Sequence, residues 1–206
     1  MSLVFYSAKW SSASPVACAL LELDVPHVTV TFDLTKSDHK KPEFLALNPN
    51  GKVPALVVDG TPMFEALAIL QFLGDRYGVE QGLWPGAKDP ARLVALSWST
   101  WAYVTYGTGL ALLGCATSDR FAKELNNPAQ ADLARKELDK ALGLLEDRLT
   151  QQKYMLGEKY SLVDLVVASV VGYGEMVGMK TDAHPRVNAW LREFQSRPAC
   201  KAVTEG

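Results

Sequence analysis

The chain has 206 residues, which is enough for one large domain or two compact ones and too few for a long modular assembly. Its 21 basic and 23 acidic side chains give a net charge of −2, so no overall positive field exists to attract nucleic acid or anionic lipid. Apolar residues make up 48% of the chain and charged residues 21%, a composition that excludes an intrinsically disordered protein.

The three cysteines, Cys18, Cys115 and Cys200, are widely spaced and include no C-x-x-C pair. This pattern indicates neither a disulfide framework nor a zinc site, and it favours a reducing compartment. The N-terminal stretch lacks a basic segment followed by a long apolar run, and no stretch reaches the ~18 uninterrupted apolar residues that span a bilayer. We therefore expect a cytoplasmic protein without a metal, a membrane segment or a nucleic-acid partner.

The first part of the chain alternates strand and helix patterns. Short β-type runs at 3–6 and 27–34 flank a helical pattern at 13–24, which predicts a β-α-β start on a partly parallel sheet. Two further short runs, at 52–60 and 61–64, meet at the hairpin dipeptide Asp59-Gly60. A helical pattern at 65–78 completes an α/β domain.

The sequence pattern changes after Gly78. Residues 79–92 contain glycines and prolines that interrupt regular structure, and they are predicted to be a linker. Beyond it the periodicity is helical, with helices expected near 89–116, 128–151, 161–178 and 184–195. The prediction is thus α/β plus all-α, with domains at 1–80 and 88–206.

A proline lies inside an apparent strand start, in the segment Lys52-Val53-Pro54-Ala55-Leu56. Proline has no amide N–H to give to a sheet, so it requires a sheet edge or a special turn there. A cis Val53-Pro54 bond is one solution, and it would turn the Val53 backbone toward an extended peptide ligand. The local residues alone favour a trans bond, because only ~5% of X-Pro bonds in folded proteins are cis.

Two motifs in this region resemble the N-terminal domain of the glutathione transferase family. They are Asn48-Pro49-Asn50-Gly51-Lys52-Val53-Pro54-Ala55-Leu56 and Glu65-Ala66-Leu67-Ala68-Ile69-Leu70. The segment GEKYSLVD, from Gly157 to Asp164, looks like the family's helix-initiating motif. The resemblance implies a thioredoxin-like fold for residues 1–80, a helical domain after it, and a cis Val53-Pro54 bond.

The GEKYSLVD segment also has a physical interpretation of its own. Ser161 as the N-cap and Asp164 at the third helical position can satisfy free backbone amides reciprocally. We predict that this pair stabilises the second half of the chain and does not catalyse.

The resemblance implies an enzyme that activates the thiolate of glutathione, its cosubstrate, and conjugates it to a hydrophobic electrophile. The family uses a Tyr, Ser or Cys near the end of the first strand, and Ser11 lies where serine-type members of the theta and phi classes carry their hydroxyl. We predict Ser11 as the catalytic residue and Ser12 or Ser14 as the cap of the first helix, although which of the three hydroxyls activates the thiol stays open. A serine without an adjacent base should donate a hydrogen bond to sulfur, and the helix N-terminus should add positive potential.

The two ends of glutathione also need partners. Glu65 is expected to pair with the γ-glutamyl ammonium, and the helix that starts there is expected to receive the neighbouring carboxylate. Ala66 stands where the family usually has serine, so one side-chain donor is missing while the amide remains. The resemblance places the glycyl carboxylate near His39, Lys40 and Lys52, which the residues alone describe equally well as a solvated charged cluster. The predicted glutathione-binding residues are His39, Lys40, Lys52, Val53, Pro54, Glu65 and Ala66.

The electrophile is expected to bind between the domains, against the first helix of the second half. Trp98, Trp101 and Thr105 recur there at i, i+3 and i+7, whereas Tyr106 should project elsewhere. An aromatic stripe is more often core than pocket, and Trp10, beside Ser11, is an equally good candidate. The predicted electrophile site is Trp10, Trp98 and Trp101.

The leading interpretation, a serine-type glutathione transferase, implies a homodimer that acts in detoxification. Two other interpretations remain. A zeta-like glutathione-dependent isomerase is one, because Ser11-Ser12-Ala13-Ser14 resembles the Ser-Ser-Cys-Ser loop of that class, with Ala13 in place of the cysteine. A non-catalytic transferase-like binding module is another, and Ala66 mildly favours it. Cys18 lies deep in the first helical pattern and is predicted to be a small buried hydrophobe.

Overall fold

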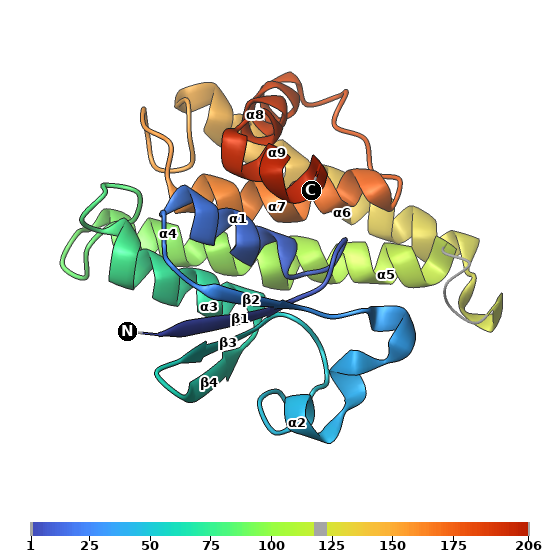
Figure 1. Cartoon of the computed structure of the whole chain (residues 1–206). Coiled ribbons are helices and arrows are strands. Elements are labelled where there is room, and N and C mark those ends of the chain that lie inside the picture. The colour runs from blue at the N-terminus through green and yellow to red at the C-terminus, as the bar shows by residue number, and fades with distance from the viewer. Residues whose placement is uncertain (1, 118–122, 206) are drawn as a thin grey trace. The chain divides into compact units, whose positions relative to one another are not determined.

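The computed structural model describes residues 2–117 and 123–205 and divides into two compact units (Figure 1). The first unit is Met1–Lys88 with Ser196–Gly206, and the second is Asp89–Gln195. The chain therefore changes unit close to the predicted boundary, whereas residues 196–206, assigned above to the helical domain, group with the first unit. The predicted outer limits, residues 1 and 206, lie outside the described residues.

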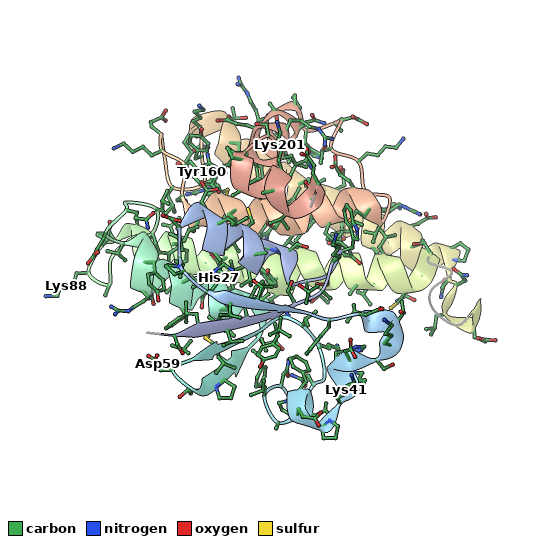
Figure 2. The ribbon with its side chains drawn as sticks, in the orientation of Figure 1. His27, Lys41, Asp59, Lys88, Tyr160 and Lys201 are labelled. Atoms are coloured by element: carbon green, nitrogen blue, oxygen red, sulfur yellow. The ribbon has the colours of Figure 1, made fainter. Side chains whose placement is uncertain are left out.

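The first unit is built on a mixed four-stranded sheet in the order β2-β1-β3-β4. Strand β1 (Leu3–Ser7) runs parallel to β2 (Val28–Thr31) and antiparallel to β3 (Ala55–Val58), which in turn pairs antiparallel with β4 (Thr61–Phe64). The predicted β-α-β start and hairpin are thus confirmed. Asp59 (φ 47°) and Gly60 (φ 85°) both have the positive φ that a tight type I′ hairpin needs, and Figure 2 marks Asp59 at this turn.

Helices cover both faces of this sheet because neighbouring residues of β1 point in opposite directions. Phe5 is buried on the side of α1 (Ser14–Glu22) and α3 (Ala66–Leu73), which pack against each other. Tyr6 faces α2 (Pro42–Leu45), where its ring lies 5.6 Å from that of Phe44. Figure 1 shows α2 and α1 on opposite sides of the strands.

Two segments of the first unit depart from the predicted elements. The expected helix at 65–78 is α3 followed by a π-helical turn, Gly74–Gly78, and Trp84 from the predicted linker packs on Gly74 so closely that a Cβ there would lie 2.6 Å from the indole. A C-terminal helix, α9 (Pro198–Glu205), was not predicted, and it packs against α1. This contact explains why the last residues belong to the first unit.

The second unit is entirely helical in its described residues. The helices expected near 128–151, 161–178 and 184–195 are confirmed, while the one expected near 89–116 is divided by a π-helical turn at Trp101–Tyr106. The helices are α4 (Ala91–Thr100), α5 (Gly107–Thr117), α6 (Pro128–Gln151), α7 (Leu162–Met176) and α8 (Pro185–Gln195). A short 3-10 turn, Lys123–Leu125, precedes α6.

The predicted capping box organises the start of the buried helix α7. Asp164 is fully buried and accepts hydrogen bonds from the Ser161 amide (2.9 Å) and hydroxyl (2.8 Å), and also from the Met155 amide and the Trp190 indole. Burial raises the pKa of Asp164, and the four donors oppose that shift. The predicted capping box is thus confirmed.

Within residues 2–117 and 123–205, no helix combines the length and apolar character needed to cross a bilayer. The same residues contain no group of three or more His, Cys, Asp or Glu side chains placed to hold a metal ion.

Candidate active site

The loop between β1 and α1 folds back on itself through Ser11. The Ser11 hydroxyl donates to the Ala8 carbonyl at 2.6 Å, and its oxygen accepts the Ala13 amide at 3.2 Å. Trp10 has a positive φ of 54° and a side chain that is 73% exposed. The N-cap of α1 is Ala13, which makes no side-chain capping bond, so the expectation that Ser12 or Ser14 caps this helix was wrong.

Ser12 links this loop to the proline segment. Its hydroxyl donates to the Val53 carbonyl at 2.8 Å, across 41 residues of chain. The Val53-Pro54 peptide bond is cis, as the resemblance implied, and both residues are buried. Ser12 itself is exposed, whereas Ser11 is half-buried. The geometry therefore brings a solvent-accessible hydroxyl to the backbone of Val53.

Asn48 holds the turn that precedes Val53. Its side chain is 3% exposed, donates to the Lys52 carbonyl at 2.6 Å and accepts the Asn50 amide at 3.0 Å. Gly51 has a φ of 56°, and an added Cβ would meet Leu45, Lys40 and the His39 carbonyl at 3.0–3.1 Å. A glycine is therefore required for this turn to lie against residues 39 and 40.

The three cationic or basic residues predicted for the glycyl carboxylate lie around this same turn. Lys40 donates to the Gly51 carbonyl at 2.8 Å, and Lys52 is exposed at the end of the turn. The Nδ1 atom of His39 is buried and has no hydrogen-bond partner among the described residues. Lys41, by contrast, pairs with Asp38 at 2.7 Å and is part of an exposed charged cluster (Figure 2).

Glu65 connects β4 to α3 in an unusual backbone conformation. It has φ 73° and ψ 116°, is exposed, and makes no side-chain capping hydrogen bond. Non-glycine residues in such sparsely populated regions cluster at ligand-binding sites. Ala66, 5% exposed, is the first residue of α3, so the free amides of the first turn begin there.

A cavity of about 170 Å³ adjoins the same loop within the first unit. Its lining includes Lys9, Trp10, Thr31 at the end of β2 and Val203 of α9. Trp10, one of the predicted electrophile-site residues, therefore combines an exposed indole with a hollow beside it.

The other two predicted tryptophans lie in the second unit and contact each other. The Trp98 and Trp101 rings are 5.0 Å apart, and the Arg148 guanidinium lies over Trp98 at 5.2 Å. The π-helical turn brings Tyr106, five residues after Trp101, to 5.8 Å from its ring. The expectation that Tyr106 projects elsewhere was wrong, because the prediction assumed a regular 3.6-residue period through this turn.

Sequence reasoning missed two features of this region. The motif that contains Asn48 assigns this residue no role, and no sequence pattern predicts the Ser12–Val53 bond. A buried asparagine between a helix end and Pro49-Asn50-Gly51 is a signal of a side-chain-stabilised turn that could have been used. No local pattern could reveal the Ser12 contact, since its partner is distant in sequence.

The fold and this site define the class of the protein: a thioredoxin-like α/β unit with a cis-proline segment beside its first helix, together with an all-helical unit. Models of the glutathione S-transferase N-terminal domain and of the glutathione S-transferase C-terminal domain match residues 10–76 and 107–198. The chain belongs to the glutathione S-transferase family, and glutathione transfer is the activity of this enzyme class.

Individual relatives extend over nearly the whole chain. Glutathione S-transferase APIC of Nicotiana tabacum is 30% identical over 97% of this chain and 95% of its own length. The glutathione S-transferase hmp2 of Hypomyces subiculosus is 30% identical over 100% and 99%. A glutathione transferase from Methylococcus capsulatus matches with a TM-score of 0.84 at 26% identity over 98% and 97% of the two chains. URE2P6 of Phanerochaete chrysosporium, solved with oxidized glutathione, has the same fold, with a TM-score of 0.87 at 23% identity and coverage of 99% and 95%.

Proposed function

We propose that this protein is a serine-type glutathione transferase that binds glutathione along the Val53 backbone and stabilises its thiolate with a hydroxyl of the Ser11-Ser12 pair. The observation that carries the proposal is the hydrogen bond from Ser12 to the Val53 carbonyl. It joins the hydroxyl-bearing loop to the segment on which an extended peptide would pair.

Of the two, we propose Ser12 as the hydroxyl that turns to the sulfur. Ser11, which the family resemblance predicts, is the alternative. The Ser11 hydroxyl donates to the Ala8 carbonyl inside its own loop, and Ser11 is half-buried. Ser12 donates to the Val53 carbonyl and is exposed, so a bound ligand reaches Ser12 more easily. Lowering a thiol pKa from ~8.5 to ~6.5 requires roughly 2.7 kcal/mol, a sum within reach of one charge-assisted hydrogen bond and the α1 N-terminus.

The ends of the tripeptide are assigned to charged residues on either side. Glu65 would pair with the γ-glutamyl ammonium, and the α3 amides from Ala66 onward would receive its carboxylate. His39, Lys40 and Lys52 would hold the glycyl carboxylate. The buried Nδ1 of His39 has no partner among the described residues, and such an unpaired polar atom is typical of a residue with a role beyond packing, which supports this placement.

The electrophile would be a hydrophobic small molecule that stacks on exposed aromatic surface. Trp10, with the cavity beside it, supports this part of the proposal, and Trp98 and Trp101 stay proposed electrophile residues of the second unit. Conjugation of such compounds is a detoxification reaction. We also propose that the enzyme is a homodimer in the cytoplasm, as its family resemblance implies.

The test combines glutathione calorimetry with conjugation kinetics on 1-chloro-2,4-dinitrobenzene. Ser12→Ala should keep glutathione affinity and lose about 2 kcal/mol of transition-state stabilisation, or about thirtyfold in kcat/KM. If kcat/KM fell in Ser11→Ala and not in Ser12→Ala, Ser11 would be the hydroxyl that stabilises the thiolate. A wild-type protein that does not bind glutathione would refute the proposal.

A further inference from the structure

Two cysteines that the transfer reaction does not use meet in the first unit. Cys18 of α1 and Cys200 of α9 are 182 positions apart in sequence, yet α9 packs on α1 so that the two thiols interact with each other. Neither is in a disulfide, and their exposed fractions are 3% and 9%. Figure 2 marks Lys201, the residue that follows Cys200 in α9.

The surrounding contacts hold the two thiols in register. Arg197 lies three residues before Cys200 and forms an ion pair with Glu22, which lies four residues after Cys18 on the same face of α1. The Arg197 Nε to Glu22 Oε2 distance is 3.3 Å, and the Glu22 side chain is only 9% exposed. Ion pair and thiol pair therefore bridge the same two helix surfaces, one turn apart.

The two thiols differ in their surroundings. Cys200 is the third residue of α9, close to the free amides of that helix N-terminus, which favour a thiolate. Contact with Cys18 lowers the pKa of Cys200, while the same contact and burial raise the pKa of Cys18. An attacking cysteine beside a protonated resolving cysteine is the arrangement that thiol–disulfide exchange requires.

A cavity lies beside the two helices that carry this pair. Ala17, the neighbour of Cys18, and Val203, one turn after Cys200 on α9, both line the cavity of about 170 Å³ described above. The cavity therefore borders both helices that carry the thiols.

We propose that Cys18 and Cys200 form a redox site that reacts with low-molecular-weight disulfides, such as oxidised glutathione, and closes into an intrachain disulfide between α1 and α9. The Cys200 thiolate attacks one sulfur of the reagent, a mixed disulfide forms, and one small thiolate leaves. Cys18 then gives its proton to solvent and attacks the Cys200 sulfur, which expels the second small thiolate. The protein loses two thiol protons and two electrons, and the reagent disulfide is reduced to two thiols.

The experiment exposes the reduced, full-length protein to cystamine and, separately, to oxidised glutathione. Thiols are titrated under denaturing conditions, and proteolytic peptides are mapped by mass. In the wild type the titre should fall from three thiols to one, and a Cys18–Cys200 cross-linked peptide should appear. The matched control Cys115→Ser should fall from two thiols to none. Cystamine lacks the glutamyl and glycyl groups of glutathione, so its reaction does not depend on the proposed glutathione site.

Variants separate the two roles. Cys18→Ala should accumulate the mixed disulfide on Cys200, and Cys200→Ala should form neither the mixed nor the intrachain disulfide at these positions. A wild type that keeps all three thiols, or a cross-link that involves Cys115, would overturn the proposal. The wild-type peptide map decides the matter even where a variant fails to fold.

Discussion

Ser11 and Ser12 show how two adjacent, chemically identical residues acquire different capacities. Ser11 is engaged twice within its own loop, whereas Ser12 reaches the Val53 carbonyl and stays exposed. A hydroxyl on an exposed residue is easier for a bound ligand to reach than one that closes a turn. Aligning the sequence with the family motif cannot reveal this difference between the two serines.

Replacing Ala66 with serine should increase the affinity for glutathione. Ala66→Ser would restore a hydroxyl donor at the first residue of α3, where the γ-glutamyl carboxylate is proposed to bind. We expect glutathione to bind tighter by about 1 kcal/mol, or roughly fivefold in Kd, measured by calorimetry. The control is Ala68→Ser, an exposed position in the same helix, which should leave Kd unchanged. Equal or weaker binding by Ala66→Ser would place the carboxylate elsewhere.

At the scale of the element, the capping box gives a stability prediction. Ser161→Ala removes the hydroxyl that donates to Asp164 at 2.8 Å and should lower the free energy of unfolding by about 1 kcal/mol in urea denaturation. The control is Ser97→Ala, which removes an exposed hydroxyl on α4 that donates to the Leu93 carbonyl. It should change the free energy of unfolding by less than about 0.5 kcal/mol. Similar losses in both variants would argue against a specific role of the cap.

The seam between α1 and α9 gives a second stability prediction. Arg197→Ala would leave the Glu22 carboxylate, 9% exposed, without its ion-pair partner, at a cost of about 1–3 kcal/mol. Arg135→Ala breaks an exposed pair with Asp132 and should cost less than about 1 kcal/mol. Urea denaturation followed by circular dichroism measures both. If Arg197→Ala were as mild as Arg135→Ala, the ion pair would not anchor α9.

Elements with strong local periodicity were predictable from the sequence, and elements set by distant partners were not. The helices α6, α7 and α8 follow directly from their apolar spacing and caps. Helix α9 escaped because it is short and its burial depends on the surface of α1, far away in sequence. The π-helical turn at Trp101–Tyr106 escaped because its residues fit an ordinary helix pattern.

The same division holds for the candidate site. The Asn48-to-Leu56 motif and Glu65 predicted where the ligand-binding segments lie, and the cis Val53-Pro54 bond is confirmed. The detailed partners could not be read from the sequence, because Ser12 contacts Val53 and Lys40 contacts Gly51 through folding of the whole unit. Cys18 is buried, as predicted, but its pairing with Cys200 was beyond any local pattern.

At the scale of the whole molecule, the proposed homodimer sets the expected solution mass. Light scattering coupled to size-exclusion chromatography should give twice the chain mass of 22.5 kDa at micromolar concentration. Because a dimer dissociates on dilution, the apparent mass should fall toward one chain only at concentrations below its Kd. A mass of one chain at every concentration would contradict the proposed assembly.

The most direct test of the central claim is a pH titration of the ultraviolet absorbance of the glutathione thiolate bound to the enzyme. The wild type should show a thiol pKa well below the ~8.5 of a free thiol, near ~6.5, and Ser12→Ala should return it toward the free value. Ser11→Ala is the matched comparison and should keep the depressed pKa. A bound thiol that titrates like free glutathione in the wild type, or a pKa unchanged in both serine variants, would contradict the account.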